Sequence, residues 1–266
     1  MINDKLIYFE THQQVIHKTW LLFVHGAGGS TRTWKRQIES LGKHYNLLLI
    51  DLPGHGQNAG REKVDPLYSF PMVAKKIWQV VDHLRIKSLH LVGVSVGTII
   101  CLQMKEQRPK NVRSLIMPGA IVKLNIKLRL LANFSLSLAK IIGYPAFYKL
   151  SALIMMPRNN HKKSRDVFIR ESKALTTDEF RKWTSLYYGL HETLKKLFIS
   201  TTEMPHLLVM GDQDHLFLKP AKKFANFHSN AIISIIPKCG HVVSIEQAQK
   251  FNDICLNFLK THFKND

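Results

Sequence analysis

A chain of 266 residues can bury a large core, and it fits one α/β domain with an insertion better than two equal domains. Lysine and arginine total 38 against 19 acidic residues, a formal net charge of +19, but no zinc finger, RNP pattern or arginine-rich recognition helix accompanies that charge, so we expect no nucleic-acid partner. Three widely spaced cysteines form neither a disulfide framework nor a zinc cluster, and no apolar segment is typical of a secretory signal or a membrane span, which together predict a cytoplasmic protein.

Short apolar runs alternate with helical patterns over the first 120 residues. The runs lie at 21–24, 47–50, 89–92 and 115–117, and their uniformly apolar character predicts parallel strands covered on both faces. Helical spacing of apolar residues lies between them, at 34–41 and, after Pro71, at 73–84. This alternation predicts a doubly wound, mostly parallel α/β sheet.

The middle of the chain has a different pattern. Residues 121–201 contain no convincing strand, and the apolar face of their expected helices is marked by Leu124, Leu128, Leu131, Leu138 and Ile142. We therefore predict a helical cap at 121–201, inserted into a core domain formed by 1–120 and 202–266. Such an insertion is expected above the carboxyl ends of the strands, where ligands bind in open α/β sheets.

Strand and helix return after the insertion. Strands are expected at 207–210 and 232–236, and a last helix is expected to start at Ser244, which has capping-box spacing to Gln247. That helix is predicted to bury Ala248, Phe251, Cys255 and Phe258.

The segment "VGVSVG" places Ser95 between an expected strand and an expected helix. A serine hydroxyl is a poor nucleophile unless a neighbouring base takes its proton, and the base needs a third group to orient it. A late histidine, His241, follows the last expected strand, and an acid, Asp212 or Asp214, follows the strand before it. These residue types suit nucleophilic catalysis if the fold brings them together.

Five motifs in this order resemble those of the α/β-hydrolase superfamily, namely "LLFVHGAGG", "LLLIDLPGHGQN", "VGVSVG", "GDQD" and "CGH" with Glu246 nearby. The resemblance covers about residues 20–263 and implies an α/β-hydrolase fold with a Ser95–Asp214–His241 triad, because the family pattern places the acid three residues after the glycine of "GDQD". It assigns the oxyanion hole to the backbone N–H groups of Ala27 and Val96.

Other positions in these motifs are expected to have structural roles. His25 and His55 are expected to brace loops, and Asp212 to bond nearby backbone. Val94 stands where relatives often carry histidine, and we expect it to pack beneath the turn at Ser95.

The sequence therefore predicts a serine hydrolase that cleaves a carboxylic ester, or a related acyl bond, of a small to medium apolar substrate. Two alternatives stay open: a ligand-binding signalling module with little turnover, and C–C hydrolase, lyase or acyltransferase chemistry on the same triad. No P-loop, H-E-x-x-H or G-x-G-x-x-G pattern is present, so no metal and no cofactor is expected.

The cap is expected to set specificity. Candidates for the wall of an acyl pocket are Leu130, Phe134, Leu138, Tyr144, Phe147, Met155 and Met156. No acidic residue occurs in 107–165, which predicts attraction of an anionic substrate, a weak contact with an anionic membrane surface, or a solvated cationic face. The sequence leaves the oligomeric state open.

Overall fold

A computed structural model describes residues 6–13, 19–61, 68–124, 138–139, 141–187, 189–200 and 203–263. Seven strands of this part of the chain form one sheet in the order β1-β3-β2-β4-β5-β6-β7. All neighbours pair in parallel except β1, which is antiparallel to β3. The strands are β1 (Phe9–His12), β2 (Trp20–Val24), β3 (Asn46–Ile50), β4 (Leu89–Gly93), β5 (Val112–Pro118), β6 (His206–Gly211) and β7 (Ala231–Ile236).

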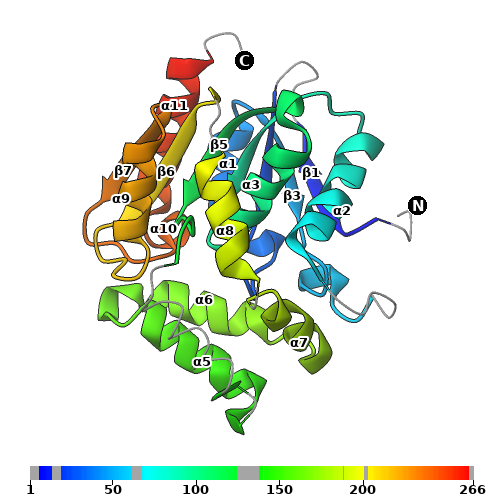
Figure 1. Cartoon of the computed structure of the whole chain (residues 1–266), viewed down its shortest axis with the longest axis vertical. Helices are drawn as coiled ribbons and strands as arrows, with labels where there is room; N and C mark the ends of the chain where they lie inside the picture. The colour runs from blue at the N-terminus through cyan, green and yellow to red at the C-terminus, as the bar shows by residue number, and fades with distance from the viewer. Residues whose placement is uncertain are drawn as a thin grey trace.

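Helices cover both faces of the sheet, which confirms the predicted doubly wound arrangement (Figure 1). The α-helices of the described residues, including those of the cap, are α1 (Lys35–Gly42), α2 (Phe70–His83), α3 (Val96–Gln107), α5 (Tyr144–Met155), α6 (Lys162–Ser172), α7 (Thr177–Ser185), α8 (Leu190–Ile199), α9 (Leu218–Phe227), α10 (Val243–Glu246) and α11 (Ala248–His262). Side chains alternate across each strand, so Leu21 and Phe23 pack with the α1 and α11 layer while Leu22 and Val24 pack with the α2 and α3 layer. Both faces of β2 are therefore apolar.

The sequence prediction missed β1. Its residues, "FETH", are mostly half-buried, and the strand forms one edge of the sheet. An edge strand carries polar side chains and so lacks the apolar run that identified the central strands.

The predicted start of the last helix was wrong. A short helix, α10, spans Val243–Glu246, and α11 begins separately at Ala248. Gln247, between them, has φ −129° and ψ 54°, which breaks the helical path, and no side chain caps either helix. The predicted burial of Phe251, Cys255 and Phe258 is correct, whereas Ala248 is only half-buried.

Between β5 and β6 the described residues form helices, including α5 to α8. In Figure 1, α5, α6 and α7 lie at the lower end of the molecule with α5 outermost, and α8 lies against the α3 side of the core. The apolar face predicted for this segment is only partly observed, because Leu138 is half-buried, Ile142 is exposed, and Leu128 and Leu131 fall outside the described residues. The domain boundary at 121–201 stays a prediction.

Searching the described residues finds no helix that is both long enough and apolar enough to cross a membrane.

Candidate active site

Ser95 lies in a sharp turn between β4 and α3, with φ 56° and ψ −119°. A non-glycine residue in this region of φ/ψ space is strained, and such strain persists only where the surrounding structure holds it in place. Gly97 allows the turn to approach β2, because a Cβ atom there would lie 2.3 Å from the Val24 carbonyl oxygen. Gly93 is equally constrained, since its Cβ would lie 2.4 Å from the Gly97 carbonyl oxygen. The two glycines of "VGVSVG" thus permit a turn that presents the serine side chain.

Three side chains that are distant in sequence meet at the carboxyl ends of the strands. The Nε2 atom of His241 lies 3.0 Å from Ser95 Oγ, and its Nδ1 atom lies 2.8 Å from Asp214 Oδ2. Ser95 follows β4, Asp214 follows β6 and His241 follows β7, so parallel pairing of the strands brings their loops to one edge of the sheet. The geometry allows the imidazole to donate to the carboxylate and accept from the serine hydroxyl.

Asp214 is almost fully buried, and its charge is stabilised by hydrogen bonds. Burial alone raises the pKa of Asp214, but the neighbouring His241, its hydrogen bond and the N–H groups of Phe217 and Leu216 outweigh that effect and lower the pKa. The Phe217 N–H donates to Asp214 Oδ1 at 3.0 Å, which leaves Oδ2 facing the imidazole. The carboxylate is therefore held in its ionised form.

Asp212, the other candidate acid, bonds to backbone and not to the His241 imidazole. Its Oδ1 atom accepts a hydrogen bond of 3.2 Å from the Cys239 N–H, in the loop that carries His241. It therefore bonds backbone, as the sequence suggested, but in the loop after β7 rather than in its own turn.

The predicted oxyanion donors come from two segments of the chain that lie next to Ser95. Val96 is the first residue of α3, so its N–H has no partner within that helix. Ala27 follows Gly26, where a Cβ atom would lie 3.2 Å from Ser95 Cβ. Both Ala27 and Val96 line the same cavity as Ser95. The arrangement suits stabilisation of negative charge beside the serine.

His25 and His55 are buried braces. The Leu52 N–H donates to His25 Nε2 at 3.0 Å, and the Gly28 N–H donates to His55 Nε2 at 2.9 Å. Burial lowers the pKa of His25 to about 4, and burial together with the neighbouring His25 lowers that of His55 to about 3. Both rings are therefore neutral near pH 7 and hold the loops after β2 and β3 together.

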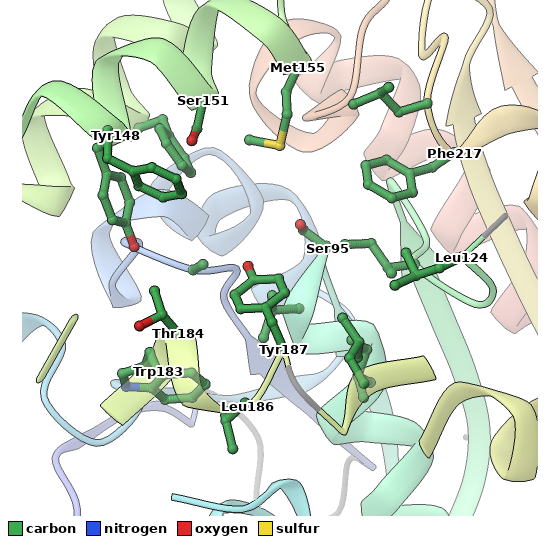
Figure 2. A pocket seen from close by; sticks show the side chains of 18 of the residues that line it. Ser95, Leu124, Tyr148, Ser151, Met155, Trp183, Thr184, Leu186, Tyr187 and Phe217 are labelled. Carbon is green, nitrogen blue, oxygen red and sulfur yellow. The ribbon is translucent and has the colours of Figure 1, made fainter. Parts of the chain in front are cut away.

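A cavity of about 180 Å³ opens beside Ser95 under the cap (Figure 2). None of the lining residues in the described part of the chain is charged; they are Ala27, Phe70, Ser95, Val96, Ile99, Ile121, Leu124, Phe147, Tyr148, Ser151, Ile154, Met155, Phe168, Phe180, Trp183, Thr184, Leu186, Tyr187, Leu190, Leu216 and Phe217. Such a wall suits a neutral, largely apolar group.

The sequence identified only part of this wall. Phe147 and Met155 line the cavity as predicted. Among the described candidates, Leu138, Tyr144 and Met156 do not line it, and Met156 is fully buried instead. The other two candidates, Leu130 and Phe134, lie outside the described residues. Most of the wall was missed because helix–helix contacts in the cap and its docking on the core decide which side chains face inward.

A second, smaller cavity of about 50 Å³ lies on the His241 side of Ser95. Its walls include Val94, Val167 and Ser164, and unlike the larger cavity it is lined by His241. Val94 is buried beneath the turn, as expected from the sequence. Ser95 therefore stands between two spaces of different size.

No lysine or arginine among the residues that the structure describes lines either cavity. Helix α5 exposes Lys149 together with Leu150 and Leu153. The expected contact with an anionic membrane surface stays a prediction. Among the described residues, no group of three or more His, Cys, Asp or Glu side chains is placed to hold a metal ion.

The model of the alpha/beta hydrolase fold family matches residues 19–248. The chain belongs to this family. It is 27% identical over 265 residues to the dihydrolipoyllysine-residue acetyltransferase component of the acetoin cleaving system of Pseudomonas putida, a match that covers 92% of this chain and 64% of that protein. It is 24% identical over 276 residues to mouse monoacylglycerol lipase ABHD6, covering 94% of this chain and 78% of the relative.

Solved structures of alpha/beta hydrolases share the same fold. A structure from a study of carboxylesterases of Nitrososphaera gargenis superposes with a TM-score of 0.78 at 21% identity, covering 97% of this chain and 96% of the other. The relatives of this alpha/beta hydrolase include esterases and hydrolases, which supports its assignment as a hydrolase enzyme.

Proposed function

We propose that this protein is a serine hydrolase that cleaves carboxylic esters, or related acyl bonds, of small to medium, largely apolar substrates through an acyl-enzyme. The observation that carries the proposal is the position of His241, whose two ring nitrogens lie 3.0 Å from Ser95 Oγ and 2.8 Å from Asp214 Oδ2. The uncharged cavity beside Ser95 supplies space for an acyl chain.

The proposed reaction begins with attack of Ser95 Oγ on the ester carbonyl carbon. His241 Nε2 takes the serine proton, and Asp214 orients the ring and stabilises the imidazolium. The Ala27 and Val96 N–H groups donate to the oxyanion of the tetrahedral intermediate. When that intermediate collapses, the alcohol leaves with the proton from His241.

The second half of the reaction releases the acid. His241 takes a proton from a water molecule, and the resulting hydroxide attacks the acyl carbon. The second tetrahedral intermediate then collapses, and His241 returns the proton to Ser95 Oγ. Water adds across the ester bond, so no further reactant is required.

The two cavities suggest how an ester would lie across Ser95. His241 must reach the leaving oxygen, so we place the alcohol portion of the ester in the smaller cavity, which His241 lines. The acyl portion then occupies the larger cavity, about 180 Å³ against about 50 Å³. This partition favours esters with a long acyl portion and a short alcohol.

A panel of methyl esters with acyl chains of increasing length tests the proposal, compared between the native protein and Ser95→Ala. We expect acid release by the native protein and a loss of several orders of magnitude in the variant, because members of a triad act as a unit. A fluorophosphonate should label the native protein and spare Ser95→Ala.

Two outcomes would contradict ester hydrolysis. If Ser95→Ala hydrolyses the esters as fast as the native protein, Ser95 is not the nucleophile. Rapid labelling of Ser95 without turnover of any ester would favour the signalling module, or chemistry on a carbon–carbon bond or acyl transfer.

A further inference from the structure

Besides Thr184, whose hydroxyl donates to the Arg181 carbonyl oxygen at 3.0 Å, three hydroxyl-bearing residues of the cap line the larger cavity. Tyr148 and Ser151 come from α5, and Tyr187 follows α7. In Figure 2 the Ser151 oxygen points into the cavity and the Tyr187 hydroxyl points toward Ser95. Within the described part of the chain, none of these hydroxyls takes part in a hydrogen bond.

The lack of partners distinguishes these tyrosines from others in the cap and its contacts. The Tyr68 hydroxyl donates to Glu179 Oε2 at 2.5 Å, and the Tyr144 hydroxyl donates to the Ser172 carbonyl oxygen. Tyr148 is only 6% exposed, and among the described residues its hydroxyl has no such acceptor. Because these residues line the cavity, a ligand that displaces water from it leaves their hydroxyls unpaired unless it supplies a partner, which costs free energy comparable to a lost hydrogen bond.

The surroundings define what that partner can be. Burial raises the pKa of Tyr187, and burial with the neighbouring Tyr187 and Tyr144 raises the pKa of Tyr148. Both phenols therefore keep their protons and can donate. Among the described residues, none that lines the cavity is charged, so none balances a charged ligand, and the rest of this wall is mostly aliphatic and aromatic. The fitting partner is a neutral oxygen acceptor embedded in an otherwise apolar chain.

We infer that the acyl portion of the substrate carries an internal neutral oxygen, such as a keto, ether or hydroxyl group, which accepts a hydrogen bond from Tyr187, Tyr148 or Ser151. This inference rests on the proposed ester hydrolysis and refines its substrate class. Plain alkyl chains fit the cavity but leave the three hydroxyls unpaired, so discrimination arises from the hydrogen bond rather than from the shape of the chain.

The test uses methyl octanoate and a set of analogues in which an ether oxygen replaces one methylene at each position from 4 to 7. For each ester, kcat/KM is measured with the native protein and with Tyr187→Phe, Tyr148→Phe and Ser151→Ala. We expect at least one variant to lower the ratio of oxa-ester to octanoate by about 2- to 12-fold, the range of a single neutral hydrogen bond. The intrinsic reactivity of each ester cancels in this comparison.

Tyr144→Phe is the matched control, because it removes the same atom from a tyrosine whose hydroxyl bonds Ser172 and which does not line the cavity. It should leave the ratio unchanged even if it lowers stability. The inference is overturned if the ratio stays constant in all three test variants.

A binding measurement separates this result from failure of the proposed hydrolysis. 1-Octanol and its oxa-analogues are titrated while tryptophan fluorescence is followed, because one of the four tryptophans, Trp183, lines the cavity. A weaker preference for an oxa-alcohol in a test variant supports the inference even if no ester is hydrolysed. Equal preference in the native protein and in all variants contradicts it, whatever the turnover.

Discussion

Ser164, on α6, donates a hydrogen bond of 2.7 Å from its Oγ atom to Oε1 of Glu246, on α10. The other carboxylate oxygen of Glu246 accepts from the Gly240 N–H at 2.7 Å, directly before His241. One carboxylate therefore joins the helical segment between β5 and β6 to the loop that positions the imidazole. Glu246 lines neither cavity, so a change of this residue should affect the chemistry without touching the substrate.

Glu246→Gln should lower kcat by about 3- to 10-fold, because the amide replaces one acceptor with a donor that faces an N–H or O–H group. The same substitution at the exposed Glu192 is the matched control and should leave kcat unchanged. Steady-state kinetics on a methyl ester, with circular dichroism to verify folding, gives the comparison. Equal rates in both variants would show that the contact does not position His241.

The two aspartates of "GDQD" should differ sharply in their effect on turnover. Asp214→Asn removes the carboxylate that orients the imidazole, and we expect kcat to fall by about 10³- to 10⁴-fold. Asp212→Asn affects only a backbone contact to Cys239, and a change below about 10-fold is expected. Single-turnover rates measured on both variants check this. The reverse ranking would assign the acid to Asp212.

Enlarging a side chain in each cavity should separate acyl from alcohol selectivity. Val167 lines only the smaller cavity and Ile154 only the larger one. Val167→Phe should lower kcat/KM for butyl esters relative to methyl esters of one acid, whereas Ile154→Phe should lower it for long acyl chains relative to short ones. If both variants alter acyl preference alone, the alcohol does not lie beside His241.

Folding stability should fall as the pH drops below about 6.5. Unfolded histidine titrates near pH 6.5, whereas burial lowers the pKa of His25 to about 4 and that of His55 to about 3. At a pH between the folded and unfolded pKa values, both histidines bind a proton in the unfolded chain but not in the folded protein. Each of the two residues should therefore remove about 1.4 kcal/mol of stability per pH unit as the pH falls.

Urea denaturation between pH 7 and pH 5 measures this slope. His55→Gln should make it shallower, by an amount that rises to about 1.4 kcal/mol per pH unit at the acidic end, because the unfolded chain then binds one proton fewer. The same substitution at the exposed His83 is the control. An unchanged slope in His55→Gln would mean that His55 is protonated in the folded protein.

Local patterns in the sequence were sufficient for the central strands and for the turn at Ser95. A strand that is apolar on both sides must be buried on both faces, and a serine flanked by glycines at the strand end suits a turn too tight for larger residues. The order of the serine, acid and histidine along the chain, together with the family resemblance, also identified Asp214. Those features depend on neighbours in sequence or on a shared fold.

Other features depend on contacts between segments that are distant in sequence, and only the tertiary structure shows them. Strand β1 is held by its partner β3, so its own polar sequence did not reveal it. The break at Gln247 and the carboxylate bridge from Ser164 to Gly240 depend on contacts between distant segments. Which cap residues face the cavity, including Tyr187, is set by how several helices rest on the core, since a helix that is apolar on more than one side does not indicate which side faces inward.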